Sequence, residues 1–131
     1  MPFYGNSLHL SVLLKAVQAG NSSYWNEWRE KNTASPIDLQ GAELSRMDLS
    51  KFKLHNADLR YANLSHTCLY EADLRYANLE KADLTGADLR KANLYQTNLC
   101  EANPDGSSFI ASDSIDATLR KTSLCEVSFS H

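Results

Sequence analysis

The sequence predicts an all-β solenoid that follows a short helical segment, and two periodicities support this fold class. From Leu39 onward nearly every fifth residue is a large apolar one, and the residue two places earlier is usually small. Before residue 34 the apolar residues have the three- and four-residue spacing of a helix instead. We therefore expect two regions, a pair of short helices in residues 1–33 and a solenoid in residues 34–131.

The large apolar series keeps its phase over most of the chain. Of its nineteen positions, seventeen hold Leu or Phe. The exceptions are Pro104 and Ser114. Residues expected in the core of the solenoid are Leu59, Leu64, Leu69, Leu74, Leu79, Leu84, Leu89 and Leu94 of this series, with Ala72, Ala77, Ala82 and Ala87 of the small one.

A period of five fits neither a helix nor a strand, whose repeats are 3.6 and two residues. It suits a chain that turns a corner once in every five residues. The residue between the small and large positions is usually Asp or Asn, as at Asp58, Asn63 and Asp73. These side chains favour corners because they hydrogen-bond the nearby backbone and tolerate unusual dihedral angles.

The motif Ala-(Asp/Asn)-Leu-x-x resembles that of the pentapeptide-repeat family, and the resemblance covers residues 36–131. It implies a right-handed quadrilateral β-helix, in which four pentapeptides make one coil of 20 residues with Leu and Ala inside. About five coils are then expected. A leading helical pair with a Trp-Asn-x-Trp-Arg stretch also resembles bacterial, often cyanobacterial, members.

Charge pairing supports the 20-residue coil independently of the family. Residues 20 apart should be neighbours on stacked coils, where unlike charges stabilise and like charges destabilise. One pair at this spacing, Asp38 and Asp58, is of like charge. Six are of opposite charge: Lys51/Glu71, Glu71/Lys91, Lys53/Asp73, Arg60/Glu80, Lys81/Glu101 and Glu101/Lys121.

The N-terminal region is expected to cover one end of the solenoid. Leu10, Leu13, Leu14 and Val17 share one helical face, with Asn6 or Ser7 as N-cap and Gly20 as the stop. A second helix should start near Asn21 or Ser22 and carry Trp25 and Trp28. We assign Leu13, Leu14, Trp25 and Trp28 to this cap, because an open end exposes core side chains. The alternative is a ligand clamp formed by the two tryptophans.

The small positions of the first coil agree with a cap. Three of the four hold Ile37, Met47 and Phe52 in place of Ala, and larger side chains there would meet the helices.

The C-terminal part of the pattern is less regular. Pro104 stands at a core position, and Ser114 interrupts the series again. We expect irregularity around residues 104–116, either as a bulge or as a segment that leaves the coil and returns. Because no helix follows Phe129, the last coil with Leu124, Val127 and Phe129 is a candidate surface for a tail-to-tail homodimer.

Composition argues against several classes of function. The formal net charge is −3 with no basic block, so we expect no nucleic-acid partner. No apolar run reaches the roughly 20 residues of a membrane span, and no secretory signal is visible, so cytoplasmic localisation is expected. An odd count of 3 Cys leaves at least one thiol free or paired between chains. The four His residues show no metal-ligand spacing, and we expect neither an enzyme nor a cofactor.

What remains is the outer surface. Spacing of 20 residues places Tyr70 beneath Arg90 and Arg75 beneath Tyr95, with Tyr76 nearby. These five residues are the candidate interaction surface, since Tyr and Arg are enriched at binding hot spots. The alternative is that Arg stacked on Tyr only stabilises the coil ladder.

Two functions stay open at this point. One is a non-enzymatic scaffold or regulator that binds a protein partner of unknown identity. The other is mimicry of DNA to protect a topoisomerase such as gyrase, which the resemblance allows. Residues 36–131 hold 14 acidic and 10 basic residues, a difference of −4, with the two signs interleaved. This charge is small for a DNA mimic, so the scaffold is the preferred function.

Overall fold

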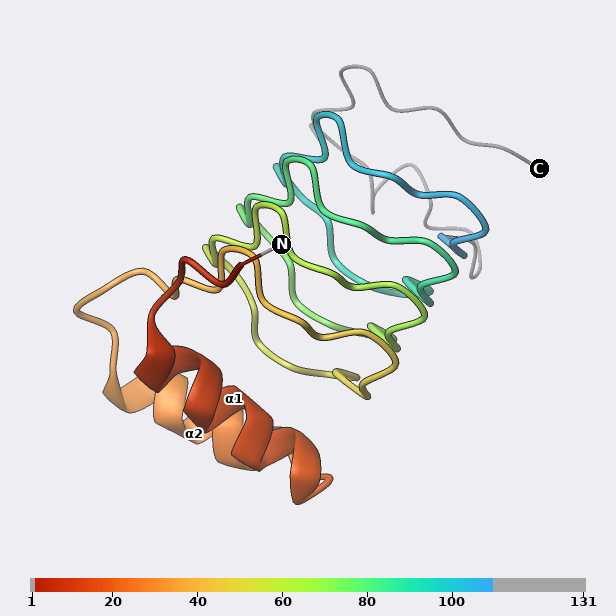
Figure 1. Cartoon of the computed structure of the whole chain (residues 1–131). Coiled ribbons are helices and arrows are strands. Elements are labelled where there is room, and N and C mark those ends of the chain that lie inside the picture. The colour runs from red at the N-terminus through yellow and green to blue at the C-terminus, as the bar shows by residue number, and fades with distance from the viewer. Residues whose placement is uncertain (1, 110–131) are drawn as a thin grey trace.

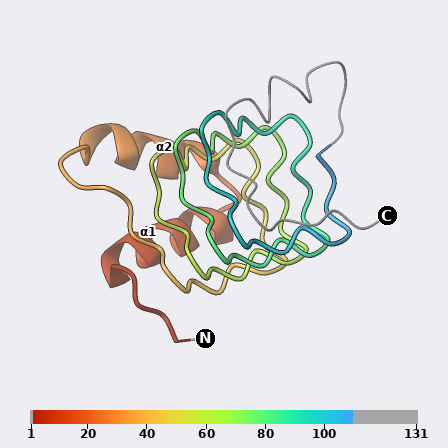
Figure 2. The same ribbon diagram turned by 90° about the horizontal axis from the view of Figure 1, so that it is seen from above.

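The computed structural model describes residues 2–109 and shows two helices followed by a stack of coils. Helix α1 spans Ser7–Gln18 and helix α2 spans Ser22–Lys31. Figure 1 shows both helices lying at one end of the stack, against its first coil, with α1 in front of α2. Seen from the direction of Figure 2, the coils follow one another along a single axis that leads away from the helices.

Both helices begin at asparagine caps. The Asn6 side chain accepts hydrogen bonds from the backbone N–H groups of Leu8 and His9, and Asn21 caps α2 through the N–H of Ser23. Gly20 follows α1 with a φ of 62° and ends it, as expected from the sequence.

The coil contains 20 residues, because its β-bridges are parallel and join residues 20 apart. Four rows of bridges define four faces: face 1 through Asp38, face 2 through Glu43, face 3 through Asp48 and face 4 through Lys53. On face 1, for example, Asp38 pairs with Asp58, and Asp58 pairs with Asn78. Each bridge is a single residue wide, so the chain turns after every one.

The corners explain why Asp or Asn stands just before each Leu. In each pentapeptide the N–H of the small residue bonds the carbonyl of the Leu three places earlier, as from Ala62 to Leu59. The residue before the small one has a positive φ, such as 62° at Tyr61, which a type II turn requires. The Asp or Asn side chain accepts from the N–H two residues on, as Asn63 does from Ser65.

The interior is filled by the residues assigned to it from the sequence. Both apolar series are at most 1% exposed through the middle coils. These buried residues are Leu59, Leu64, Leu69, Leu74, Leu79, Leu84, Leu89, Leu94, Ala72, Ala77, Ala82 and Ala87. Thr67 and Thr97 replace Ala without leaving an unpaired hydroxyl, since each Oγ1 donates to a backbone carbonyl of the preceding coil, those of Leu44 and Leu74.

The predicted irregularity does not begin at Pro104. Residues 104–109 continue the coil: Pro104 and Phe109 are buried, and Ser108 pairs with Asp88 on face 3. Core residues such as Leu84 donate their N–H to the following coil, at Asn103, whereas Pro104 has no N–H to donate and keeps only its packing in the core. Residues 110–116 lie outside the described residues, as do Leu124, Val127 and Phe129 of the proposed dimer end.

Charge pairing between coils is weaker than the spacing suggests. Of the six opposite pairs, Lys81–Glu101 is the one within salt-bridge distance among residues 2–109, at 3.7 Å. Arg60 and Arg75 instead turn back to the carboxylates two residues before them, Asp58 and Asp73. The register inferred from these charges is nevertheless that of the coil.

No helix within residues 2–109 has both the length and the apolar character needed to cross a membrane.

Candidate functional site

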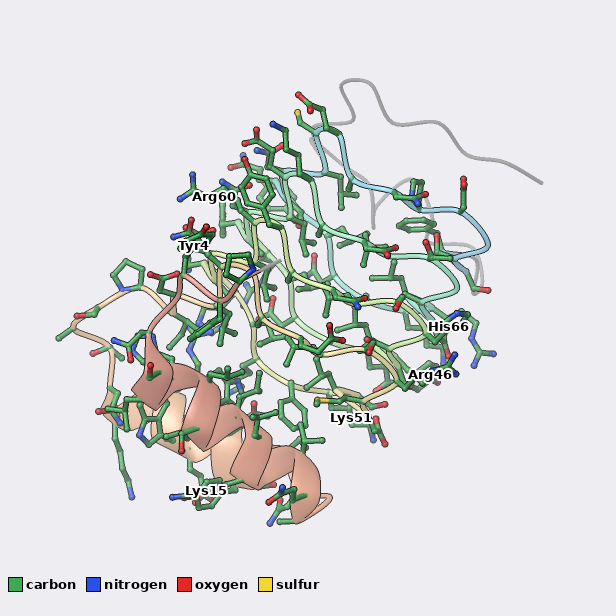
Figure 3. The ribbon with its side chains drawn as sticks, viewed as in Figure 1. Tyr4, Lys15, Arg46, Lys51, Arg60 and His66 are labelled. Atoms are coloured by element: carbon green, nitrogen blue, oxygen red, sulfur yellow. The ribbon has the colours of Figure 1, made fainter. Side chains whose placement is uncertain are left out.

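The N-terminal residues contact the first coil where a preceding coil would otherwise pair with it. On face 1 the N–H groups of Tyr4 and Asn6 donate to the carbonyls of Gln40 and Asp38, at 3.0 and 2.9 Å. Nδ1 of His9 accepts the N–H of Asp38 at 3.0 Å. Figure 3 labels Tyr4 where the N-terminal segment meets the coil stack.

Side chains of α2 have the same role on face 4. Trp25 Nε1 and Arg29 Nη1 both donate to the carbonyl of Lys53, at 2.9 and 2.8 Å. Arg29 Nη2 donates to the carbonyl of His55, and Asn26 Oδ1 accepts the N–H of Lys53. Faces 1 and 4 of the first coil are therefore fully paired.

The two tryptophans lie inside this junction. Trp25 is completely buried and stacks on Trp28, with ring centroids 5.5 Å apart. His9 contacts Trp28 edge-on. Because neither face of the Trp25 ring reaches the surface, this geometry favours the cap over a ligand clamp.

Helix α1 is rotated from the face that the leucine spacing suggested. Its buried residues are His9, Val12, Leu13 and Ala16, whereas Leu14 is only half-buried. The rotation follows from the position of α1, which packs on α2 as well as on the coil. Ile37 and Phe52 are buried in the same core as Leu13 and Trp25.

Arg29, His55 and Asp73 form a polar cluster at the edge of this junction. Burial and the nearby Arg29 lower the pKa of His55, whose Nδ1 is 3.4 Å from a carboxylate oxygen of Asp73. Burial tends to raise the pKa of Asp73, but hydrogen bonds from Arg75 outweigh it and the net pKa is lowered. The cluster is thus an ionised carboxylate between a neutral histidine and two arginines.

The first part of the candidate interaction surface lies at the corner between faces 3 and 4. The Arg90 guanidinium is 5.7 Å from the centroid of the Tyr70 ring, as the spacing predicted. Lys91 Nζ lies 5.6 Å from the same centroid. The structure therefore adds Lys91 to this surface. The sequence feature that could have indicated Lys91 is its spacing of 21 residues from Tyr70, one residue more than the length of a coil.

The second part lies at the corner between faces 4 and 1. Tyr76 and Tyr95 contact each other edge-on, with centroids 5.7 Å apart, and half of Tyr76 is exposed. Arg75 is directed to Asp73 through two hydrogen bonds, at 2.8 and 2.7 Å. Face 4 thus has aromatic rings and cations along both of its borders.

A third aromatic and cationic contact lies elsewhere and was missed from the sequence. Lys81 Nζ is 5.6 Å from the centroid of the Tyr61 ring, at the corner between faces 1 and 2. The 20-residue spacing of Tyr61 and Lys81 was the available signal.

Chemically reactive groups are dispersed over the described coils. Within residues 2–109 no three His, Cys, Asp or Glu side chains gather as a metal site. Cys68 is a free, half-buried thiol, 3.0 Å from the hydroxyl of Ser50. The aspartate side chains accept hydrogen bonds from the backbone two residues on, as Asp83 does from the N–H of Thr85.

Comparison with known proteins gives a consistent result. The Pentapeptide repeats family matches in 8 copies over residues 37–75 and 67–103. No curated protein matches.

Solved structures of pentapeptide repeat proteins resemble the chain. That of Rfr23 from the cyanobacterium Cyanothece 51142 is 36% identical, with a TM-score of 0.51, and covers 76% of this chain; the chain spans 64% of Rfr23. The structure of alr5209 from Nostoc PCC 7120 is 29% identical over 79% of this chain and 94% of alr5209, with a TM-score of 0.38. HetL, involved in heterocyst differentiation regulation in Nostoc PCC 7120, is 33% identical over 63% of this chain and 45% of HetL, with a TM-score of 0.30. The chain belongs to the pentapeptide-repeat family, whose members fold as right-handed β-helices.

Proposed function

We propose that this chain is a non-enzymatic scaffold or regulator that binds a protein partner through face 4 of its solenoid. The observation that supports this most is the arrangement of aromatic rings and cations along both borders of that face. Tyr70 with Arg90 and Lys91 forms one border, and Tyr76 with Tyr95 forms the other.

Rigidity makes this surface suitable for binding. The rings project from corners whose backbone is fixed by hydrogen bonds to the coils above and below, such as Tyr76 N–H to the carbonyl of Tyr95. A side chain held on a fixed backbone loses less conformational entropy when a partner binds. Tyr and Arg also supply large contact areas, which is why they dominate binding hot spots.

Mimicry of DNA is less well supported by the surface. Three carboxylates of the bridge positions, those of Asp58, Asp73 and Asp88, are each paired with an arginine two residues on. A DNA mimic needs rows of carboxylates free of nearby cations. A gyrase supercoiling assay distinguishes the two functions, since the scaffold leaves supercoiling unchanged and a mimic alters it.

The test of the scaffold uses two matched double variants. Tyr76→Ala with Arg90→Ala removes one ring and one guanidinium at the borders of face 4. Arg46→Ala with His66→Ala removes the same two kinds of group at the corner between faces 2 and 3, where Figure 3 shows both residues. Affinity purification from the native cell identifies partners. The dissociation constant of each partner for the native chain and for both variants is then measured with purified proteins.

We expect the face 4 variant to bind the partner at least tenfold more weakly than the native chain does, and the control variant to bind it with unchanged affinity. Equal binding by both variants, or loss with the control alone, would contradict the assignment to face 4.

We further propose that α1 and α2 act as the N-terminal cap of the quadrilateral solenoid. Two observations support this proposal. Hydrogen bonds from the N-terminal residues and α2 pair the edges of faces 1 and 4, and Leu13 and Trp25 share a core with Ile37 and Phe52.

A further inference from the structure

Each face of the first coil has three backbone groups directed away from the second coil. They are the N–H and carbonyl of the bridge residue and the carbonyl two residues on, as the bonds between later coils show. On face 1 these groups belong to Asp38 and Gln40, and all three are paired with Tyr4, Asn6 and His9. On face 4 they belong to Lys53 and His55, and all three are paired with α2.

Faces 2 and 3 differ from the other two. Their groups belong to Glu43 and Ser45 on face 2 and to Asp48 and Ser50 on face 3. Within residues 2–109 none of these six backbone groups has a partner beneath the first coil. Glu43 and Asp48 are exposed residues, so water reaches this edge. An edge of this kind is a template for another extended chain.

A groove lies along α1 on the same side of the molecule. It has a volume of about 410 Å³ and is lined by Phe3, Ser7, Leu10, Ser11, Leu14, Lys15 and Gln18. Its Phe3 end adjoins face 2, because Phe3 and Pro2 lie directly against Gly41, two residues before Glu43. Figure 1 shows α1 running below the front of the first coil, and Lys15 points away from that coil in Figure 3.

We propose that an extended segment of a partner protein binds the face 2 edge as an added strand. Two of its N–H groups donate to the carbonyls of Glu43 and Ser45, and one of its carbonyls accepts the N–H of Glu43. Side chains alternate along a strand, so every second one enters the groove and contacts Phe3, Leu10 and Leu14. This surface is distinct from face 4.

The N-terminal residues of the chain show that the edge accepts such a strand. Tyr4 and Asn6, two residues apart, donate to the carbonyls of Gln40 and Asp38 on face 1. The proposed segment makes the same pair of bonds one face further along.

Charge specifies the outward side chains of the segment. The hydroxyl of Ser45 donates to the Glu43 carboxylate and lowers its pKa, so Glu43 is ionised at neutral pH. A basic residue opposite Glu43 is therefore favoured. Charge also disfavours a second copy of this chain, because antiparallel pairing of the edge with itself centred on residues 45 and 46 would bring Glu43 of one copy beside Asp48 of the other.

The test uses three acetylated seven-residue peptides as probes. The first alternates Lys and Val, the second alternates Glu and Val, and the third is the Lys–Val peptide with N-methyl groups on alternate amides. Binding to the full chain is followed by isothermal titration and by ¹⁵N chemical shifts. We expect only the first peptide to bind, with shifts centred on residues 43–45 and on Leu10 and Leu14.

Two substitutions at one position separate backbone pairing from charge. Glu43→Pro removes the edge N–H, which no described group uses, and Glu43→Ala keeps the N–H but removes the charge. We expect Glu43→Pro to weaken binding of the Lys–Val peptide about fivefold more than Glu43→Ala does. The melting temperatures of both variants should stay close to that of the native chain.

Several outcomes overturn the proposal. One is that the Lys–Val peptide causes no shifts at residues 43–45, and another is that the N-methylated peptide binds equally well. A third is that these shifts appear without peptide as the protein concentration rises, which would assign the edge to a second copy. If Glu43→Pro does not fold, the N-methylated peptide still decides the result.

Discussion

Nδ1 of His9 accepts the backbone N–H of Asp38 at 3.0 Å, which joins α1 to the first coil. A ring nitrogen can accept only when it carries no proton, so this bond requires a neutral imidazole. His9 is 8% exposed, and its pKa is lowered by burial, with Arg29 adding to the effect and Asp38 opposing it.

The first prediction is that mild acid loosens the helices. Unfolded His9 protonates near the ordinary pKa of 6.5, and the folded form resists protonation. Stability is therefore complete above about pH 7 and declines as the pH falls through 6.5 toward the lowered folded pKa. Denaturant titrations followed by tryptophan fluorescence between about pH 8 and 5.5 measure this decline.

A control isolates the histidines in that experiment. The pKa of His55 is lowered in the same direction, so the double variant His9→Gln with His55→Gln should be nearly flat over this range. Carboxylates titrate mainly at lower pH. A native chain whose stability is constant or rises on acidification would contradict the assignment of the His9–Asp38 bond.

The second prediction concerns the interior ladder. Leu79 and Leu84 are each 0% exposed, and replacing either with Ala should cost about 2–5 kcal/mol of unfolding free energy through lost packing and a residual cavity. The exposed substitution Gln96→Ala is the control and should change it by less than about 0.5 kcal/mol. Unchanged melts of the leucine variants would place this series outside the core.

The third prediction concerns Arg29, which donates to the carbonyls of Lys53 and His55. Arg29→Met keeps much of the packing but leaves both carbonyls without these donors, so we expect a loss of about 1–3 kcal/mol. Emission of Trp25 and Trp28 should shift to longer wavelength as the junction opens. The matched substitution Lys31→Met, on the exposed end of α2, should do neither. Equal effects would show that Arg29 does not hold the helix.

The fourth prediction concerns removal of residues 1–33. Truncation exposes Ile37 and Phe52, at present 0 and 3% exposed, together with the edges of faces 1 and 4. We expect aggregation or poor expression, measured by light scattering of the purified chain. A truncated chain that is monomeric and equally heat-stable would show that α1 and α2 are an independent module.

The solenoid could be predicted from the sequence because its physical constraints repeat. Each coil must place Leu and Ala inside and Asp or Asn at the bridge position just before a corner, so a single departure such as Thr67 does not hide the pattern. The 20-residue register was also readable, although Lys81–Glu101 alone of the described charge pairs forms a close contact.

The contacts that could not be predicted from the sequence are those that do not repeat from coil to coil. The pairing of Trp25, Asn26 and Arg29 with Lys53 depends on how one helix lies against one edge, and no period encodes that. Lys53 itself gave a weak signal, since it replaces Asp or Asn at a bridge position and its backbone is held by α2. Pro104 suggested an irregular segment from residue 104 onward, whereas the coil continues through residues 104–109.

Hydrogen exchange of four backbone amides tests most directly the central claim, that the N-terminal residues replace a missing coil on faces 1 and 4 only. The amides are those of the bridge residues Asp38, Glu43, Asp48 and Lys53, which occupy equivalent positions on the first coil. We expect the amides of Asp38 and Lys53 to exchange at least 100-fold more slowly than those of Glu43 and Asp48, relative to their unfolded rates. Four amides that exchange alike, whether all protected or all open, would contradict it.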